Sequence, residues 1–472
     1  MNTADNADFG LLSPATAGTA ASRLTSDSQF IQAMLDVELA WVRVLADAGY
    51  AAAEVPAAVE AAASAQLYDA AGLAARAQGG GNPLIPLLAD LRAAIKQSDA
   101  PAAAAAAAAV HKGATSQDIV DSALLLMAQR TVAAVSADLR TAAAALARLA
   151  DAHRGTVTVA RTLTQHSLPS TFGLKAANWL AGIGQAGVRL DEVAAELPLQ
   201  WGGAAGTMAA LTTLTDTGGG EGTPLELAAR LASLLGLDEP VAPWQTNRLP
   251  VTALAAALAD VLAAAGKVAN DVLLLSRPEI GELSEPRAEG RGVSSAMPQK
   301  QNPVLSVLIR SAALAAPGQL AQIQAAAAGA VDERPDGSWH VEWQPLRELL
   351  RLAGGAAAKL AELAGGLVVH EDRMAANLAL TGPLVVSEKI MAVAAPLLDG
   401  GVPGAGKPKV QALVNESLAT GASLADLLRG SISRGQLSDE QLAALLDPTN
   451  YTGQSGELIT RITSHYQEWS HS

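Results

Sequence analysis

The sequence contains no cysteine among its 472 residues, so disulfides and thiolate metal sites are excluded. Aromatic residues make up only 3% of the chain, and the β-branched residues that also favour strands are thin. Alanine, the best helix former, dominates instead. This composition predicts an all-α protein built from closely packed helices.

The chain also has little that resembles a secretion signal or a membrane span. Met1 to Phe9 is polar and acidic, and no basic stretch leads into an apolar one, so no signal peptide is expected. Charged residues and glycines interrupt the alanine-rich runs before the ~20 residues that a span requires. We therefore expect a cytoplasmic protein that contacts no membrane.

Positive charge is in short supply as well. The 32 basic residues are outnumbered by 46 acidic ones, which gives a net charge of −14. Nucleic acid requires a basic footprint, so it is disfavoured as a partner. An anionic small molecule is not excluded, because its binding depends on local clusters of arginine, lysine and amide groups.

Length and breaks in the apolar pattern suggest about three domains, at roughly 150 residues each. We predict an N-terminal helical domain over 1–110, a central helical bundle over 111–353, and a C-terminal helical domain over 354–472. A helix capped by Ser26 or Ser28 is expected to run to Gly49, and Ala102–Ala109 is expected to be helical. The longest predicted helices cover about 115–197, 251–275 and 304–323. Because such helices are apolar on most sides, we expect partner subunits to bury them.

The most informative segment is the loop from Gly292 to Pro303, which reads Gly-Val-Ser-Ser-Ala-Met-Pro-Gln-Lys-Gln-Asn-Pro. It places two hydroxyls, Ser294 and Ser295, close to the cation of Lys300 and the amide of Asn302. Its two prolines limit helix formation, since each lacks a backbone donor and has a fixed φ. A loop with these groups is suited to hold a carboxylate and to move a proton.

Two further polar segments interrupt apolar surroundings. In His111–Asp118, Thr115 and Ser116 can donate to a carboxylate, although either can instead cap the following helix. In Arg161–Pro169, His166 has a side chain that titrates near neutral pH and can act as an acid or base. A structural histidine remains the alternative interpretation there.

Glycine and aromatic residues mark the last two segments. Gln200–Thr207 is dense in glycine, so its backbone N–H groups can form an anion-binding nest or simply a turn between helices. The segment 333–343 places Arg334 and His340 among tryptophans. It can serve a binding site or form a buried packing corner.

The loop and these segments resemble, in order and spacing, the motifs of the fumarase/aspartase superfamily over roughly residues 20–390. The resemblance implies an all-helical protomer of three domains and a homotetramer whose active sites combine residues of three subunits. It also implies that no metal or cofactor is needed. Members add to, or eliminate from, a double bond next to a carboxylate.

Within the superfamily, the runs Met297–Val304 and Trp339–Trp343 are most similar to the 3-carboxy-cis,cis-muconate cycloisomerases. That resemblance implies a tricarboxylate substrate, closed to 4-carboxymuconolactone by acid/base addition of a carboxylate to a double bond in aromatic degradation. The alternative is a β-elimination that releases fumarate, as in adenylosuccinate lyases.

The resemblance also assigns roles to individual residues. Ser294 stands at the position of the catalytic serine, and Lys300 would stabilise its alkoxide; His166 is the third expected catalytic residue. The expected substrate-binding residues are His111, Thr115, Ser116, Gln165, Arg248, Ser295, Met297, Asn302 and Arg334.

Three positions depart from the superfamily pattern. Val293 replaces a glycine before the paired serines, which stiffens the entry of the loop. Leu163 stands where a catalytic histidine usually follows Arg-Thr, so proton transfer would rest on Ser294 or His166. Gln245 replaces a histidine that cycloisomerases often carry in Pro-Trp-His-Thr-Gln-Arg.

Overall fold

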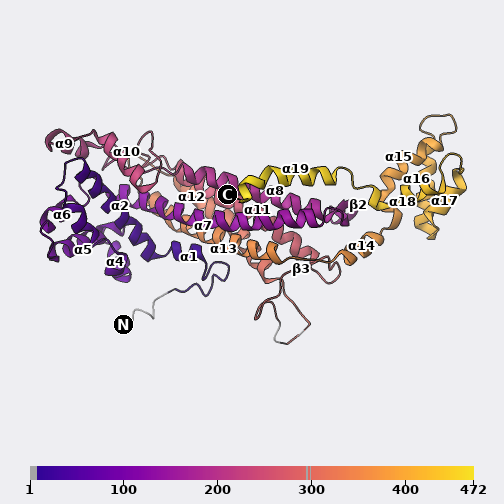
Figure 1. Cartoon of the computed structure of the whole chain (residues 1–472), viewed down its shortest axis with the longest axis horizontal. Helices are drawn as coiled ribbons and strands as arrows, with labels where there is room; N and C mark the ends of the chain where they lie inside the picture. The colour runs from indigo at the N-terminus through magenta and orange to yellow at the C-terminus, as the bar shows by residue number, and fades with distance from the viewer. Residues whose placement is uncertain (1–7, 294–295, 298, 472) are drawn as a thin grey trace. The chain divides into compact units, whose positions relative to one another are not determined.

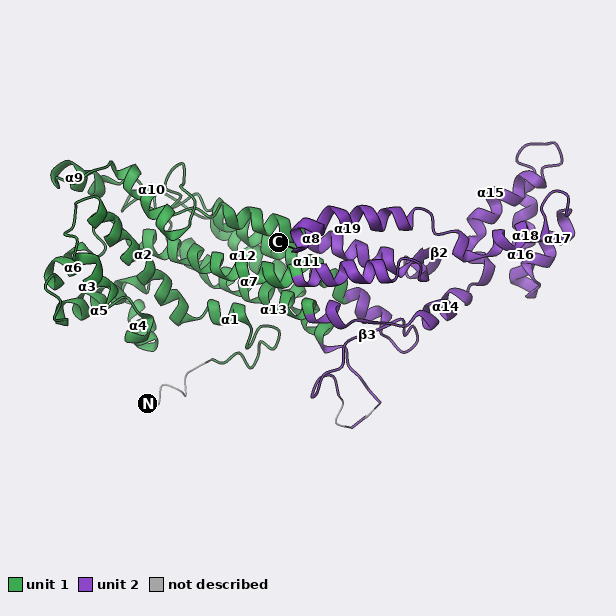
Figure 2. Ribbon diagram, viewed as in Figure 1, with its two compact units in different colours: residues 1–140, 185–269, 305–361 green, residues 141–184, 270–304, 362–472 purple. Residues whose placement is uncertain are grey.

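Helices dominate the protein, whose computed structural model describes residues 8–293, 296–297 and 299–471 (Figure 1). The prediction of an all-α protein is confirmed. Among the described residues, the named strands form two small antiparallel sheets, β1 with β2 and β3 with β4. Two compact units can be distinguished: unit 1 holds residues 1–140, 185–269 and 305–361, and unit 2 holds residues 141–184, 270–304 and 362–472 (Figure 2).

The N-terminal helices of unit 1 begin and end at local signals. Ser26 caps α2, which ends just before Gly49 in a left-handed conformation, and the predicted alanine helix is α6. The bounds are α1 Ala20–Leu24, α2 Asp27–Asp47, α3 Val55–Glu60, η2 Ala65–Leu67, α4 Ala70–Ala77, α5 Leu84–Gln97 and α6 Ala103–Ala109. Two later helices, α9 Ala209–Thr217 and α10 Pro224–Leu235, also belong to this unit.

Four long helices lie where long helices were predicted: α7 Ser116–Ala152, α8 Phe172–Ala195, α11 Leu249–Leu275 and α12 Val304–Ala328. A fifth, α13 Gly337–Gly366, was not predicted. In unit 1, α13 packs closely against α1, because a Cβ at Gly354 of α13 would collide with Ala21 of α1. Between α7 and α8, Arg140 forms an ion pair with Asp191 at 2.7 Å. Helix α13 continues through Gly354, and the division of the chain into three domains stays a prediction.

One part of the sequence prediction is wrong. The segment expected to be helical between α7 and α8 forms a β-hairpin, β1 Val157–Thr162 and β2 Gln165–Thr171. The run Val157-Thr158-Val159 is β-branched, which favours a strand over a helix. Leu163 and Thr164 join the strands with positive φ values of 48° and 71°, as a tight hairpin turn requires.

The C-terminal part of unit 2 is a small helical cluster around a core of its own. Its apolar residues include Val386, Ile390, Val410 and Leu428. The remaining elements of unit 2, in and outside this cluster, are β3 Leu283–Ser284, β4 Val368–Val369, α14 Glu371–Ala379, η3 Gly382–Val386, α15 Ser387–Leu397, α16 Gly406–Thr420, α17 Leu424–Ser431, α18 Asp439–Leu446, η4 Pro448–Asn450 and α19 Ser455–His471.

Three helices, α7, α11 and α12, are long and apolar enough to cross a membrane by length and composition alone, and the bent segment 371–397 passes the same test as a pair. The chain itself covers them unequally. Of the most apolar 18-residue stretch of each helix, 78% is buried in α7, 50% in α11 and only 28% in α12. Helix α12 therefore presents an apolar face, with Val307 and Leu314 exposed, that other residues of the described chain leave open.

Candidate functional site

The first predicted segment is held at its start by a buried glutamate. Glu38 of α2 accepts hydrogen bonds from the backbone N–H of His111 and faces its Nδ1 atom, both at 2.8 Å. His111 has a positive φ of 62° and Gly113 one of 76°. A non-glycine residue in this conformation is strained, and the two contacts to Glu38 hold it there. Ser116, also in this segment, begins α7.

Two predicted substrate contacts meet in unit 1. The guanidinium of Arg334 donates a hydrogen bond to the Thr115 hydroxyl at 2.9 Å, although the two residues are far apart in sequence. Arg334 also lies over the ring of Trp339, with 5.8 Å between the guanidinium carbon and the ring centroid. A hydroxyl and a guanidinium side by side can both donate to one carboxylate, so this arrangement is suited to bind a single anion.

Asp118 has a role that the sequence did not reveal. It is fully buried, and its carboxylate accepts from the backbone N–H groups of Thr115, Gly202 and Gly203 and from the side-chain amide of Gln200, at 2.8–3.1 Å. Burial raises the pKa of Asp118 to about 6, and the four donors oppose that shift. The predicted glycine-rich nest therefore holds an anion of its own chain, and it fixes the start of α7.

A buried ion network lies one turn further along α7. Arg248 pairs with Asp121 at 2.7 Å and with Glu342 of α13, and Trp339 donates its indole N–H to Asp121 at 2.8 Å. Burial raises the pKa of Glu342 to about 6, while the positive charge of Arg248 opposes the rise. The three ionised side chains are at most 3% exposed, so they tie α7 to α13 in a low-dielectric interior.

Arg248 has no donor left over in this arrangement. Its Nε donates to Glu342, its Nη1 to Asp121 and to the carbonyl of Gln245, and its Nη2 to Asp121 and Glu342. A guanidinium offers five N–H groups, and each has an acceptor here. This geometry does not favour the prediction that Arg248 holds a substrate carboxylate.

Gln245, which departs from the cycloisomerase pattern, is also part of this interior. Its side-chain amide donates to the carbonyl of Gly203 at 2.7 Å, and its own carbonyl accepts from Gln117 at 2.8 Å. The residue is 3% exposed. It supports the nest and the ion network, and within the described residues it does so without a titratable group.

The remaining predicted residues lie in unit 2. His166 is the second residue of β2, after Gln165, and its Nδ1 lies 2.8 Å from the hydroxyl of Thr381. Gln165 and Leu163 are exposed at the tip, Leu163 by 96%. The hairpin is anchored by Arg161, whose guanidinium pairs with buried Glu282 at 2.6 Å.

The base of the loop 292–303 is closed by its own backbone. The carbonyl of Gly292 accepts from the backbone N–H of Asn302 at 2.8 Å and from its side-chain amide at 3.1 Å. Gly292 has a φ of 71°, and a Cβ there would lie 2.5 Å from the carbonyl oxygen of Asn302, so only glycine fits. Val293 pairs with Gln301 in an antiparallel bridge, an extended conformation that suits a β-branched residue.

Beyond that base the loop is open to solvent. Met297 and Lys300 are exposed, and the backbone N–H of Lys300 donates to the carbonyl of Met297 at 2.9 Å. Ser294, Ser295 and Pro298 lie outside the described residues. Among the residues described, no group of three or more His, Asp or Glu side chains is arranged to hold a metal ion.

The motifs that carry these residues define the class of protein. Residues 14–318 match the family described as Lyase, and the chain belongs to this family of the fumarase/aspartase superfamily. The similar proteins are enzymes of several kinds. A nitrosuccinate lyase of Streptomyces davaonensis is 44% identical over 460 residues, 96% of this chain and 94% of that protein.

The cycloisomerases are similar over the same length. A 3-carboxy-cis,cis-muconate cycloisomerase of Bradyrhizobium diazoefficiens is 39% identical and covers 96% of this chain and 97% of its own. The crystal structure of a 3-carboxy-cis,cis-muconate lactonizing enzyme from Pseudomonas putida superposes with a TM-score of 0.87 at 34% identity, covering 98% of this chain and all of the other. The predicted superfamily and fold are confirmed.

Proposed function

We propose that the protein is a lyase that eliminates a leaving group from a succinate-type dicarboxylate, and that nitrosuccinate is the first substrate to test. The reaction removes a proton from the carbon next to one carboxylate. The C–N bond at the neighbouring carbon breaks, its electron pair leaves with nitrite, and a double bond forms to give fumarate. The similarity to a nitrosuccinate lyase over nearly the whole chain supports this choice.

The number of available anion contacts carries the proposal. Among the predicted substrate-binding cations, Arg248 is fully engaged by Asp121 and Glu342, and Arg334 shares one position with Thr115. Lys300 supplies the other cation, from the loop. Two such contacts match the two carboxylates of a succinate better than the three of 3-carboxymuconate.

The proposed mechanism divides the work between the two anion contacts. Thr115 and Arg334 hold one carboxylate in place. Proton removal builds negative charge on the other carboxylate, as an aci-carboxylate, and donors aimed at that charge lower the barrier. In our proposal Ser294 removes the proton as an alkoxide, which Lys300 stabilises, and His166 returns that proton to solvent.

Cycloisomerisation of 3-carboxy-cis,cis-muconate is the second candidate. The runs Met297–Val304 and Trp339–Trp343 favour it, as do the similar cycloisomerases and the lactonizing enzyme. Gln245 does not favour cycloisomerisation, because its buried amide replaces the histidine that the cycloisomerases often carry. An elimination from adenylosuccinate is the third reaction to test.

We further propose that the chain acts as a homotetramer in the cytoplasm, with active sites shared between subunits. The exposed apolar face of α12 supports self-association, since an apolar surface of that length needs cover. The separation of the predicted residues into two units also supports shared sites. Light scattering on the purified full chain tests the assembly, and a stable monomer at assay concentration would contradict it.

A substrate panel separates the three reactions. Purified protein is incubated with nitrosuccinate, 3-carboxy-cis,cis-muconate and adenylosuccinate, and nitrite, fumarate and muconate absorbance are followed. We expect nitrite and fumarate in equal amounts from nitrosuccinate, with little change in the muconate. Rapid loss of muconate absorbance without nitrite release would instead establish the cycloisomerase.

A further inference from the structure

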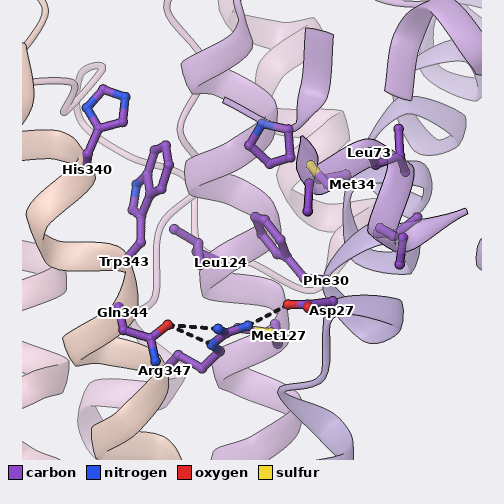
Figure 3. A pocket seen from close by; sticks show the side chains of 14 residues that line it. Asp27, Phe30, Met34, Leu73, Leu124, Met127, His340, Trp343, Gln344 and Arg347 are labelled. Carbon is purple, nitrogen blue, oxygen red and sulfur yellow. Dashed lines mark hydrogen bonds and ion pairs between the residues drawn. The ribbon is translucent and has the colours of Figure 1, made fainter. Parts of the chain in front are cut away.

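Unit 1 contains a partly open cavity that none of the predicted substrate-binding residues lines. Its volume is about 280 Å³, and helices α2, α4, α7 and α13 contribute its walls (Figure 3). Ligand pockets in proteins begin at roughly 300 Å³, so this cavity is near the size for one ring-sized molecule. It is therefore a second possible binding site, apart from the one that holds Thr115 and Arg334.

The walls of the cavity are apolar and aromatic. Phe30 and Trp343 stand on different sides of it in Figure 3, with Leu124 between them. Met34 and Met127 complete the apolar lining, and methionine adapts its shape to an inserted group. Aromatic walls of this kind favour a flat ring, because offset or edge-on ring pairs add to the apolar burial.

One edge of the cavity carries a cation that is only weakly paired. Arg347 donates to Asp27 at 2.6 Å and to the side-chain oxygen of Gln344 at 2.7 and 3.2 Å (Figure 3). The side chain of Asp27 is 71% exposed, and exposed ion pairs of this kind contribute little. An incoming carboxylate can therefore replace Asp27 on the guanidinium at low cost.

A second arginine lies near the same edge, together with the carboxylates of Asp27 and Glu348. Arg351 lies one turn beyond Arg347 on α13, and it donates to the hydroxyl and the carbonyl of Thr25. Burial lowers the pKa of Arg351, and the positive charge of Arg347 lowers it further, whereas Glu348 and Asp27 oppose this. An anion bound at Arg347 would relieve the repulsion between the two arginines.

We propose that this cavity binds a small aromatic monocarboxylate, with its ring between Phe30 and Trp343 and its carboxylate on Arg347. The apolar walls select the ring, and the guanidinium selects the charge. The proposal is independent of the reaction proposed above, because none of these residues belongs to the predicted active site. Benzoate is the simplest molecule of this class and serves as the probe.

Calorimetric titration of the full-length protein tests the site directly. Benzoate is expected to bind once per protomer, benzyl alcohol more weakly, and acetate not measurably, because it lacks the ring. The substitution Arg347→Gln removes a charged hydrogen-bond donor and should weaken benzoate binding about tenfold or more. It should leave the weaker binding of benzyl alcohol nearly unchanged.

Two control variants make the result decisive. Arg43→Gln removes an arginine of α2 that pairs with Glu60 and does not line the cavity. This variant should bind benzoate as the parent protein does. Arg334→Gln should also leave benzoate binding unchanged. The proposal is overturned if benzoate fails to bind at millimolar concentration, or if its binding is lost in Arg334→Gln but kept in Arg347→Gln.

Discussion

The polar groups of unit 1 and those of the loop 292–303 in unit 2 are held in opposite ways. Asp118, Asp121, Arg248 and Glu342 are almost completely buried, and their hydrogen bonds run to one another, to the surrounding backbone and to neighbouring buried side chains. Lys300 is exposed beyond a loop base that Gly292 and Asn302 close together with the Val293–Gln301 bridge. The buried region of unit 1 is held in place by its own contacts, whereas Lys300 of the loop is exposed to solvent.

The largest expected effect comes from the loop. Ser294→Ala should lower kcat by roughly 10²–10⁴-fold, the usual contribution of a positioned acid or base. Turnover of the substrate identified in the panel is the measurement. Because an exposed loop contributes little to folding, the assembly should be unchanged by light scattering. An active Ser294→Ala enzyme would refute the role given to this serine.

In unit 1 the corresponding effect should fall on stability. Arg248→Met leaves Asp121 and Glu342 buried without a cation, which costs about 3–5 kcal/mol in the free energy of unfolding. Urea denaturation measures the loss. Arg43→Gln, which breaks an exposed pair with Glu60, should cost less than about 1 kcal/mol. Equal losses in both variants would mean that the buried network is no more important than a surface pair.

Between these extremes lies the anion contact formed by Thr115 and Arg334. Arg334→Gln removes one charged hydrogen bond to the substrate, worth about 1.5–3 kcal/mol, so kcat/KM should fall by roughly ten- to a hundredfold. The change should appear mainly in KM, because this contact holds the substrate before and during the reaction. Steady-state kinetics measure it, and an unchanged KM would argue that Arg334 serves only to position Thr115.

The smallest effect concerns pH. The pKa values of Asp118 and Glu342 rise to about 6 in the folded chain, from ordinary values of 3.8 and 4.5. The folded state then binds more protons than the unfolded state between these values, so the free energy of unfolding falls as pH rises toward about 6. Asp118→Asn should reduce this slope in urea denaturation series, at the cost of leaving N–H donors of the nest unpaired.

That pH series also needs a matched comparison, because other groups titrate in the same range. Asp36→Asn changes a carboxylate that is partly exposed and paired with Arg130 at 2.7 Å, outside the nest. It should keep the slope of the parent protein. If Asp118→Asn keeps it as well, the buried carboxylate is held ionised by its four donors throughout.

The sequence predicted those features that depend on neighbouring residues. The N-cap Ser26 and the apolar period of α2 are local signals, and so are the breaks around the long helices. The hairpin β1–β2 was missed, although the β-branched run Val157-Thr158-Val159 was a signal for it. Long apolar helices on both sides obscured that signal.

The candidate site was predicted in its residue types but less well in its roles. The glycine-rich segment 200–207 was expected to form either an anion-binding nest or a turn between helices, and its N–H groups bind the carboxylate of Asp118, which is distant in sequence. The same is true of Arg248, whose partners Asp121 and Glu342 come from two other helices. Such contacts depend on how helices pack, and no local pattern in a single sequence records them.

The tip of the β1–β2 hairpin has a consequence for protein engineering. Leu163 is 96% exposed, and both Leu163 and its neighbour Thr164 have left-handed backbone conformations. Such a conformation costs an ordinary L-residue roughly 1–2 kcal/mol, and it costs glycine or asparagine less. In a random library selected for heat resistance, Leu163→Gly should therefore be enriched. If selection for heat resistance enriches Leu163→Gly and selection for turnover depletes it, Leu163 is retained for activity at the expense of stability. The two selections together would then show whether this exposed side chain serves the reaction.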